Sequence, residues 1–371
     1  MAGLFIGLMS GTSADAIDAA LLRFQPRLHV LATRSTPLSA KVQQRILAIH
    51  ADSPLRAVAE LDILLGRLFA QAALELLAAA GVRPEDVTAI GSHGQTVWHA
   101  PDGTVPFTLQ LGDPNVIAEL TGITTVADFR RRDVAAGGQG APLVPAFHRE
   151  IFAGAGDCCV LNLGGIANIT VLAGDATLGF DVGPANTLLD GWIRQHLGRR
   201  FDAGGAWAAS GAVLPELLEA LLEDPYFARP QPKSTGPEHF SLAWLERHLH
   251  GRAYRAQDVQ ATLLELTARS IATAVRRHAH TARQLVVCGG GVHNRALMTR
   301  LQDLLAPLPV RSTAELGVDP DFVEACAFAW LARQRLLERP GNVPEVTGAS
   351  APVILGGIYG KRVEAGLDRE G

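Results

Sequence analysis

The chain has 371 residues, which at about 150 residues per domain predicts two sizeable domains. Hydrophobic residues make up 48% of the chain and charged residues 19%, so the composition suits packed cores and excludes an intrinsically disordered or collagen-like protein. Lys plus Arg number 33 against 37 for Asp plus Glu. The formal net charge of -4 favours neither nucleic acid nor an acidic membrane surface as a partner.

The cysteines and the N-terminus indicate the compartment. Cys158, Cys159, Cys288 and Cys326 contain no Cys-x-x-Cys pair, which fits a reducing environment. The apolar stretch Leu4–Met9 lacks the basic region of a signal peptide, and no apolar run reaches the roughly 18 residues that span a bilayer. We therefore expect a cytoplasmic protein that is neither exported nor inserted into a membrane.

The first predicted elements are a strand over residues 4–8, a turn of small residues, and a returning strand over Ile17–Phe24. Ser53 and Pro54 suit the start of a long amphipathic helix, which Gly81 ends. This half of the chain therefore begins as an α/β domain.

Two later strands are expected to end in polar segments. Val87–Ile90 leads into Gly91–Thr96, and Ile123–Ala127 leads into Asp128–Arg130. Such strand ends bind ligands in α/β proteins. The following run Ala135–Pro142 is poor in side chains and is interpreted as a turn or interdomain crossing, with a domain boundary near residue 130.

The second half repeats the opening pattern. Cys159–Leu163 enters the turn Gly164-Gly165 and returns through Asn168–Leu172, and a third strand over Leu178–Phe180 is expected to end at Asp181. This similarity over about twenty residues suggests an internal duplication.

The last third alternates helices with short strands. Asp258 is expected to cap a helix that runs through Val275, and Leu285–Cys288 is expected to be a buried strand before a glycine turn and a further helix. A last helix is predicted over Asp321–Leu337. Val353–Tyr359 could return as a strand to the first domain.

Two glycine- or serine-rich turns suit phosphate binding. In Met9–Asp18 the backbone N–H groups could surround phosphate oxygens, and a nearby acid could hold hydrated Mg²⁺; the alternative is a plain hairpin turn. A second hairpin at Asn162–Asn168 favours phosphate binding, because a nucleotide cleft between duplicated lobes needs two such turns. Gly289–Asn294 could approach a base or ribose, or be an ordinary tight turn. None of these segments fits a P-loop or Rossmann pattern.

Several charged residues could carry chemistry. Asp181 could accept a proton from a hydroxyl or water, or cap a helix before Pro184. Glu324 lies on a predicted helix, where an ordinary exposed acid is the alternative. Arg130–Arg132 could anchor an anion or form a solvated turn. The twelve histidines, His93 and His148 among them, show no metal-binding spacing, and no Gly-x-Ser-x-Gly elbow supports a serine hydrolase.

The chain resembles the anhydro-N-acetylmuramic acid kinase family over nearly its whole length. The resemblance is carried by eight segments in this order: Gly7–Asp18, Gly91–Thr96, Ala127–His148, Leu161–Ile169, Phe180–Asn186, Pro232–Gly236, Val259–Leu263 and Cys288–Asn294. The family pattern usually has glycine where Ala16 and Ala185 stand, so a positive φ at either position would disfavour the alanine.

The resemblance implies an α/β fold of the two-lobed, actin-like (RNase H-like) ATPase type, with a duplicated mixed-sheet domain and a nucleotide cleft between the lobes. The expected domains are residues 1–130 plus 345–371, and residues 131–344. It also implies a homodimer, ATP as the phosphate donor and Mg²⁺ to shield the phosphates.

The implied reaction converts 1,6-anhydro-N-acetylmuramic acid to N-acetylmuramate 6-phosphate and ADP, in recycling of the cell's own murein. Water activated by Asp181 would attack C1 while O6 leaves toward the γ-phosphate. Thr96, Arg130, Asp181 and Glu324 would line the sugar site. The residues that the resemblance assigns to ATP are Gly11, Thr12, Ser13, Ala14, Asp15, Ala16, Ile17, Asp18, Asn162, Gly164, Gly165, Gly289, Gly290 and Gly291.

Two alternatives stay open. A kinase of the same fold could phosphorylate another amino sugar or a hexose, with Asp181 deprotonating its hydroxyl directly. A nucleotide-gated, actin-like binding protein would instead turn over ATP without regard to any sugar.

Overall fold

The computed structural model describes residues 3–25, 28–152, 156–231, 233–236, 238–249 and 251–361. The chain divides into two compact units. Unit 1 is Met1–Phe147 with Glu324–Gly371, and unit 2 is His148–Val323. These limits differ from the expected domains, 1–130 plus 345–371 and 131–344, because packing that the local sequence does not reveal holds residues 131–147 and the last long helix in unit 1.

Unit 1 is built on a mixed seven-stranded sheet in the order β12-β6-β4-β1-β2-β3, with β5 paired to β4. Strands β1, β2 and β3 form an antiparallel meander, and β4 runs parallel to both β1 and β6. The strands are β1 (Leu4–Ser10), β2 (Ala16–Arg23), β3 (His29–Pro37), β4 (Val87–Ala100), β5 (Phe107–Leu111), β6 (Thr125–Ala127) and β12 (Gly357–Tyr359). The helices are α1 (Ala40–Leu47), α2 (Leu55–Ala80), α3 (Pro114–Thr121), α4 (Phe129–Ala135), α13 (Val323–Leu336) and α14 (Pro344–Thr347).

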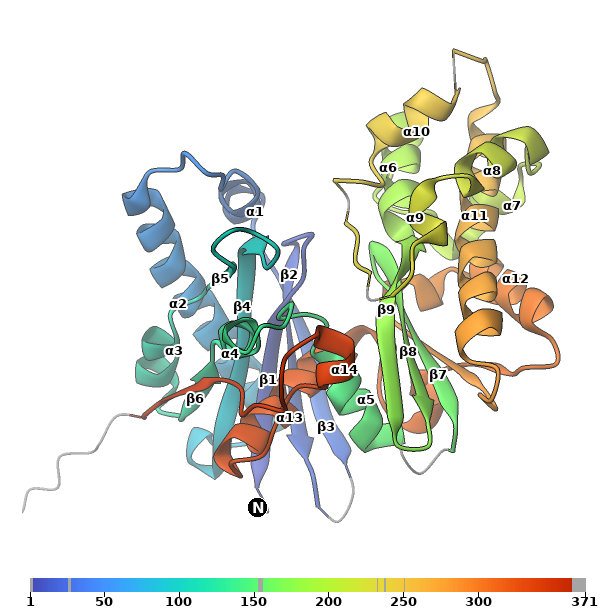
Figure 1. Cartoon of the computed structure of the whole chain (residues 1–371). Coiled ribbons are helices and arrows are strands. Elements are labelled where there is room, and N and C mark those ends of the chain that lie inside the picture. The colour runs from blue at the N-terminus through green and yellow to red at the C-terminus, as the bar shows by residue number, and fades with distance from the viewer. Residues whose placement is uncertain are drawn as a thin grey trace, which may run out of the picture. The chain divides into compact units, whose positions relative to one another are not determined.

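The two faces of this sheet take different helices because side chains alternate along a strand. Ile6 and Leu8 of β1 are buried in one cluster with the apolar side chains of α2, which contacts β1 to β5 (Figure 1). Between them, Gly7 faces α13, where an added Cβ would lie 1.7 Å from the carbonyl oxygen of Ala325. Only glycine permits this close approach of α13 to the sheet.

Helix α2 is long and apolar enough to cross a membrane by length and composition alone. In the structure its buried residues, including Leu65, Phe69 and Leu76, pack in the core of unit 1. Its predicted end is confirmed, since Gly81 forms a left-handed C-cap with φ 65°. Its start differs slightly, because Pro54 rather than Ser53 is the N-cap.

Unit 2 is built on a five-stranded sheet in the order β11-β10-β7-β8-β9. Strands β7, β8 and β9 form an antiparallel meander, and β10 runs parallel to β7 and β11. The strands are β7 (Cys158–Leu163), β8 (Ile166–Ala173), β9 (Ala176–Pro184), β10 (Leu285–Cys288) and β11 (Val310–Ser312). The helices are α6 (Asn186–Leu197), α7 (Ala206–Ala209), α8 (Pro215–Leu222), α9 (Pro225–Ala228), α10 (Leu242–Leu249), α11 (Ala256–His278) and α12 (Arg295–Leu305), while α5 (Val144–Phe152) begins in unit 1.

The two sheets share one topology. In unit 1 the meander lies in the order β3-β2-β1, and β4 is added parallel to β1. In unit 2 the meander lies in the order β9-β8-β7, and β10 is added parallel to β7. Helix α11 contacts β8 and β9 in unit 2, much as α2 contacts the meander in unit 1 (Figure 1). The fold is therefore a duplicated mixed-sheet α/β architecture of the actin-like type. The predicted duplicated mixed-sheet fold is confirmed, and the nucleotide cleft stays a prediction.

Several element limits differ from the sequence predictions. Strand β4 continues through Gly91–Thr96 to Ala100, because the first part of this stretch pairs with β1 and the part from Gln95 onward pairs with β5. Strand β9 continues past Asp181 to Pro184, since it pairs with β8 as far as Ile166. Asp258 does not cap α11; it lies in the first turn, and its carboxylate accepts the N–H of Ala212.

Two further predictions about the end of unit 1 have different outcomes. The predicted returning strand is confirmed in a shorter form, since Gly357–Tyr359 pairs with β6. The run Ala135–Pro142 is not an interdomain crossing. Hydrogen bonds from the N–H of Gln139 to Thr347 and from Ser350 to Ala136 tie it to the C-terminal segment of unit 1.

Candidate functional site

A row of polar side chains crosses the meander of unit 2. Asn162 of β7 pairs with Asn168 of β8, which pairs in turn with Asp181 of β9. Directly paired residues on antiparallel strands carry their side chains on one face. All three are partly exposed, whereas their strand neighbours, such as Leu163 and Phe180, are buried. The sheet therefore presents an accessible row that ends in a carboxylate.

Asp181 is held on one side only. Its Oδ2 accepts the backbone N–H of Thr235 at 3.0 Å, and its backbone carbonyl accepts the hydroxyl of Tyr226 at 2.7 Å. Across the described ranges, no donor meets Oδ1. Burial raises the pKa of Asp181 to about 6; Glu238 raises it further, while the Thr235 N–H and Lys233 oppose the rise. This carboxylate can accept a proton near neutral pH.

The two glycine turns of unit 2 lie at the carboxyl ends of the neighbouring parallel strands β7 and β10. The carbonyl oxygens of Gly164 and Gly165 accept the N–H groups at the start of α6. Gly289 has φ 82°, and a Cβ there would lie 2.4 Å from Oδ1 of Asn162. An added Cβ on Gly290 would meet no heavy atom within 4 Å. The backbone at Gly290 is thus open to a ligand, while Gly289 is fixed by its contacts.

In unit 1, the turn between β1 and β2 is fixed by a side chain of β4. The amide of Gln95 accepts the Ser10 hydroxyl at 2.8 Å and donates to the Gly11 carbonyl at 3.2 Å. Gly11 is open, with no atom within 4 Å of an added Cβ. The positive φ of this turn is at Ala14 (49°) and not at Ala16, which lies in β2.

The alanine at the other usual glycine position, Ala185, also has no unfavourable φ. Ala185, the N-cap of α6, has φ -127°. L-residues avoid only the positive range, so neither Ala16 nor Ala185 is strained by φ in this structure.

Arg130 reaches inward from α4 and is not part of a solvated turn. Its Nε donates to Nε2 of His93 at 2.9 Å, and its Nη1 donates to the Gly140 carbonyl at 2.8 Å. The N–H of Gly140 in turn donates to Oδ2 of the fully buried Asp133 at 2.8 Å. The guanidinium is therefore held by groups of β4 and of the loop that follows α4.

Glu324 lies in the first turn of α13, and its carboxyl group interacts electrostatically with the guanidinium of Arg130. Burial raises the pKa of its carboxyl, the negative charge of Asp18 raises it further, and Arg130 opposes the rise. Unit 1 thus brings together three residues that the sequence singled out, Glu324, Arg130 and Asp18. The fourth, Thr96, lies in β4, where its hydroxyl accepts the Gln110 amide at 3.2 Å.

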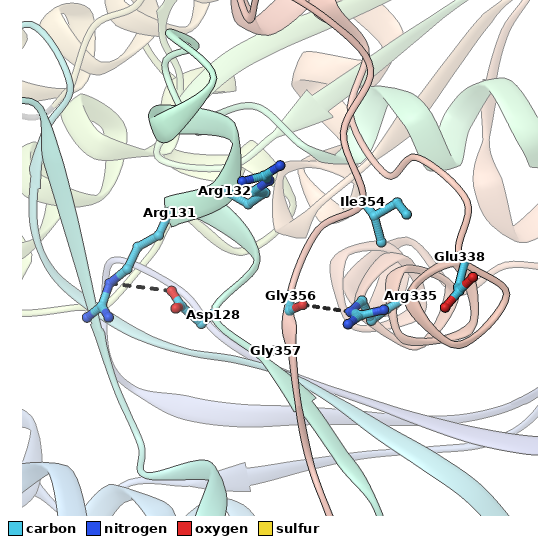
Figure 2. Close-up of a pocket in the computed structure, with 8 residues that line it drawn as sticks. All are labelled: Asp128, Arg131, Arg132, Arg335, Glu338, Ile354, Gly356 and Gly357. Atoms are coloured by element: carbon cyan, nitrogen blue, oxygen red, sulfur yellow. Dashed lines mark hydrogen bonds and ion pairs between the residues drawn. The ribbon is translucent and has the colours of Figure 1, made fainter.

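A surface cavity of about 640 Å³ in unit 1 is lined by Arg131 and Arg132 of the arginine run, but by none of the residues expected to contact ATP or the sugar. Its lining residues come from the segment after β6, from the end of α13 and from the segment that leads into β12. Figure 2 shows the ion pair of Arg131 with Asp128 and the hydrogen bond from Arg335 to the Gly356 carbonyl. These arginines have partners within the cavity wall. None of Arg130, Glu324 and Thr96 lines this cavity.

The comparisons with known proteins agree with one another. The sequence pattern of a family described as Anhydro-N-acetylmuramic acid kinase matches residues 3–361. The chain belongs to this family. A protein of that name from Coxiella burnetii (strain Dugway 5J108-111) is 51% identical over 361 residues, covering 96% of this chain and 97% of the relative. Another of that name, from Xanthomonas campestris pv. campestris (strain 8004), is 53% identical over 365 residues, with the same two shares.

Solved structures are more distant. Component A of (R)-2-hydroxyglutaryl-CoA dehydratase from Acidaminococcus fermentans aligns with 88% of this chain and 96% of its own, with 12% identity and a TM-score of 0.47.

Some residues around the predicted site of this family member were missed by sequence reasoning. Lys233 donates to the carbonyls of Tyr226 and Phe227, and its ammonium lies 4.6 Å from the centre of the Tyr226 ring. Lys233 and Thr235 belong to the family segment Pro232–Gly236, whose Pro232 lies outside the described residues. The segment was identified as part of the family resemblance, but none of its residues was assigned to the site. His93 and Gln95 stand in another family segment, but nothing local shows what they contact.

Proposed function

We propose that the chain opens the 1,6-anhydro ring of 1,6-anhydro-N-acetylmuramic acid and phosphorylates O6, giving N-acetylmuramate 6-phosphate and ADP. Family membership and the names of its relatives support an ATP-dependent kinase of this sugar. The environment of the Asp181 carboxylate is the observation that supports the ring opening. One of its carboxylate oxygens is held by Thr235, the other meets no donor in the described ranges, and its pKa is raised to about 6.

The chemistry follows from the bonds of the sugar. In a 1,6-anhydro sugar O6 is bonded to C1, so position 6 has no free hydroxyl. A water molecule loses a proton to Oδ1 of Asp181 as its oxygen bonds to C1, and the C1–O6 electron pair passes to O6. O6 bonds to the γ-phosphorus of ATP, whose bond to the β-phosphate oxygen breaks to release ADP. Asp181 then releases its proton to solvent.

The proposed phosphate contacts are the backbone groups of Gly11–Asp18 in unit 1 and, together with Asn162, of Gly164-Gly165 in unit 2. The proposed adenosine contact is Gly289–Gly291. Gly11 and Gly290 support this assignment, because open space surrounds both and no packing requirement explains why they lack a side chain.

Mg²⁺, when bound, would neutralise charge on the phosphate oxygens. The carboxylate of Asp18 is a suitable group to hold a hydrated Mg²⁺ ion, because Mg²⁺ prefers carboxylate oxygens and usually keeps several waters. The residue is partly exposed near the start of β2, at the end of the proposed phosphate segment Gly11–Asp18.

Arg130, Glu324 and Thr96 are the proposed sugar contacts in unit 1, and Asp181 is the proposed base in unit 2. After its bonds to His93 and Gly140, the Arg130 guanidinium keeps donors for a polar ligand. Glu324 supplies acceptors beside it, with its carboxyl pKa raised by burial.

The test mixes the purified protein with Mg-ATP and the anhydro sugar in ¹⁸O-water, and follows ADP release and the mass of the sugar product. The proposal requires a 6-phosphate with one ¹⁸O at C1. A 6-phosphate without ¹⁸O would exclude the attack of water on C1. ADP formed only with another sugar, or without any sugar, would overturn the proposed substrate.

A matched pair of variants tests the base. Asp181→Asn keeps the shape of the side chain and an acceptor for the Thr235 N–H but removes the base, so the rate should fall by about 10²–10⁴-fold. Asp157→Asn removes a carboxylate elsewhere in unit 2, on a partly exposed residue, and should leave the rate unchanged. Equal rates for both variants would contradict the role of Asp181.

The expected homodimer and the cytoplasmic location stay predictions, as does the absence of nucleic acid and membrane partners. Light scattering coupled to size-exclusion chromatography tests the first, and cell fractionation with an antibody against the chain tests the second.

A further inference from the structure

The guanidinium of Arg130 is only partly used by the protein. Of its five N–H donors, one on Nε bonds to His93 and one on Nη1 bonds to the Gly140 carbonyl. In the part of the chain that the structure describes, no acceptor meets the remaining three. The direction in which those three donors point is set by the two contacts that hold the guanidinium plane.

His93 must be an acceptor in this arrangement. An arginine is always protonated and has no acceptor atom, so Nε2 of His93 carries no proton and the neutral ring has its proton on Nδ1. Burial, followed by the charge of Arg130, lowers the pKa of His93 well below its ordinary value, which is consistent with a neutral ring.

The placement of His93 is costly for the fold. The residue is 5% exposed, and its Nδ1 makes no well-formed hydrogen bond, although the Gly94 backbone lies close enough to oppose the fall in the pKa of the ring. A purely apolar side chain would fill the same space without an unpartnered N–H. Buried polar groups left unpaired are expected at functional sites. The acceptor on Nε2 therefore explains a histidine here, where packing alone does not.

His93 also couples two helices. Its ring lies 4.7 Å from the ring of Phe328 and is tilted against it, and Phe328 also packs against Phe129. Phe328 is one helical turn beyond Glu324 on α13, and Phe129 precedes Arg130 on α4. The same imidazole thus holds the guanidinium through its edge and packs through its ring against the helix that carries Glu324.

We propose that His93 is a positioning residue for sugar binding, which acts by orienting the three remaining N–H donors of Arg130 beside Glu324. The proposal rests on the proposed function in one respect, that Arg130 contacts the sugar. His93 itself touches neither substrate.

Three variants test it through sugar binding. His93→Leu fills the space but cannot accept the Arg130 N–H, so the KM for the sugar should rise roughly tenfold to a hundredfold with little change in the KM for ATP. His93→Gln offers an amide oxygen near the position of Nε2 and should recover most of the affinity. His148→Leu is the matched control, since His148 is also buried with one unpartnered ring nitrogen but does not contact Arg130. Its KM for the sugar should stay unchanged.

The outcomes separate positioning from stability. If His93→Gln and His93→Leu lose affinity equally, or if His148→Leu raises the same KM, the proposal is wrong. If His93→Leu does not fold, His93→Gln is compared with the unaltered chain. A KM for the sugar close to that of the unaltered chain supports the acceptor role of His93. A loss of sugar binding contradicts it.

A spectroscopic measurement is independent of the proposed function. The ¹⁵N shifts of the His93 ring should show a protonated Nδ1 and an unprotonated Nε2, and the Arg130 Nε–H resonance should move in His93→Leu. A protonated Nε2 would overturn the proposal even in an active enzyme. Conversely, a chain that releases no ADP with the anhydro sugar but shows this tautomer would refute the proposed function and leave the contact intact.

Discussion

The backbone N–H of Thr235 donates to Oδ2 of Asp181 at 3.0 Å, so the carboxylate is fixed on one side while burial raises its pKa to about 6. A base must be ionised to accept a proton, and we therefore predict that kcat/KM falls as the pH drops through about 6. Initial rates of ADP release between about pH 5 and about pH 8 measure this profile. A profile that stays flat down to about pH 4.5 would show that Asp181 is not the group that titrates.

The same raised pKa predicts a cost to stability. Because the folded-state pKa of about 6 exceeds the ordinary value of 3.8, the folded chain keeps a proton that the unfolded chain has lost. The stability contribution of Asp181 thus falls as the pH rises from about 4 to about 6. Asp181→Asn cannot ionise, so it should be more stable than the unaltered chain at pH 7 by up to about 3 kcal/mol.

Thermal unfolding midpoints measured between about pH 4 and about pH 7.5 test this difference, which should vanish at the acid end. Asp157→Asn is the control with the opposite sign. The Gly174 N–H lowers the pKa of Asp157, so this variant should gain nothing near neutral pH. A constant difference between Asp181→Asn and the unaltered chain at every pH would point to packing and not to ionisation.

The sequence predicted elements well where local chemistry decides them. The small-residue turns after β1 and β7 fixed two strand–turn–strand units, and the run of four apolar residues at Leu285–Cys288 became β10 with those limits. It predicted poorly where a distant partner decides. Nothing within Gly91–Thr96 shows that this polar segment pairs with β1 and then with β5, and nothing near Asp181 shows that β9 continues to Pro184.

The candidate site shows the same division. Asp181, Arg130 and Glu324 could be chosen from their residue types and from the family resemblance. Their partners could not, because the acceptor for Arg130 is 37 residues earlier in the chain, on β4. The unit boundaries were also out of reach, since α13 belongs to unit 1 through contacts with glycines of strands far away in the sequence.

Gly91 should be intolerant of substitution because α13 lies directly on it. A Cβ at this position would be 2.0 Å from the carbonyl oxygen of Phe328, a backbone atom that cannot move without shifting the helix. We predict that Gly91→Ala destabilises the chain by about 3 kcal/mol. Gly360→Ala is the matched control, since its Cβ would meet no atom within 4 Å and its φ is not positive, and its stability should change by less than about 0.5 kcal/mol. Similar unfolding midpoints for the two variants would show that α13 does not depend on this contact.

Substitution of Gly290 tests whether this glycine is needed for ligand binding or for the fold. Its φ is not positive and an added Cβ would meet open space, so Gly290→Ala should fold with the stability of the unaltered chain. If adenosine packs against this turn, the new methyl group would occupy part of its place, and the KM for ATP should rise roughly tenfold while the KM for the sugar stays constant. Gly289→Ala makes the contrast, because φ 82° and the close Oδ1 of Asn162 predict a loss of stability there. An unchanged KM for ATP in a folded Gly290→Ala variant would place the adenosine elsewhere.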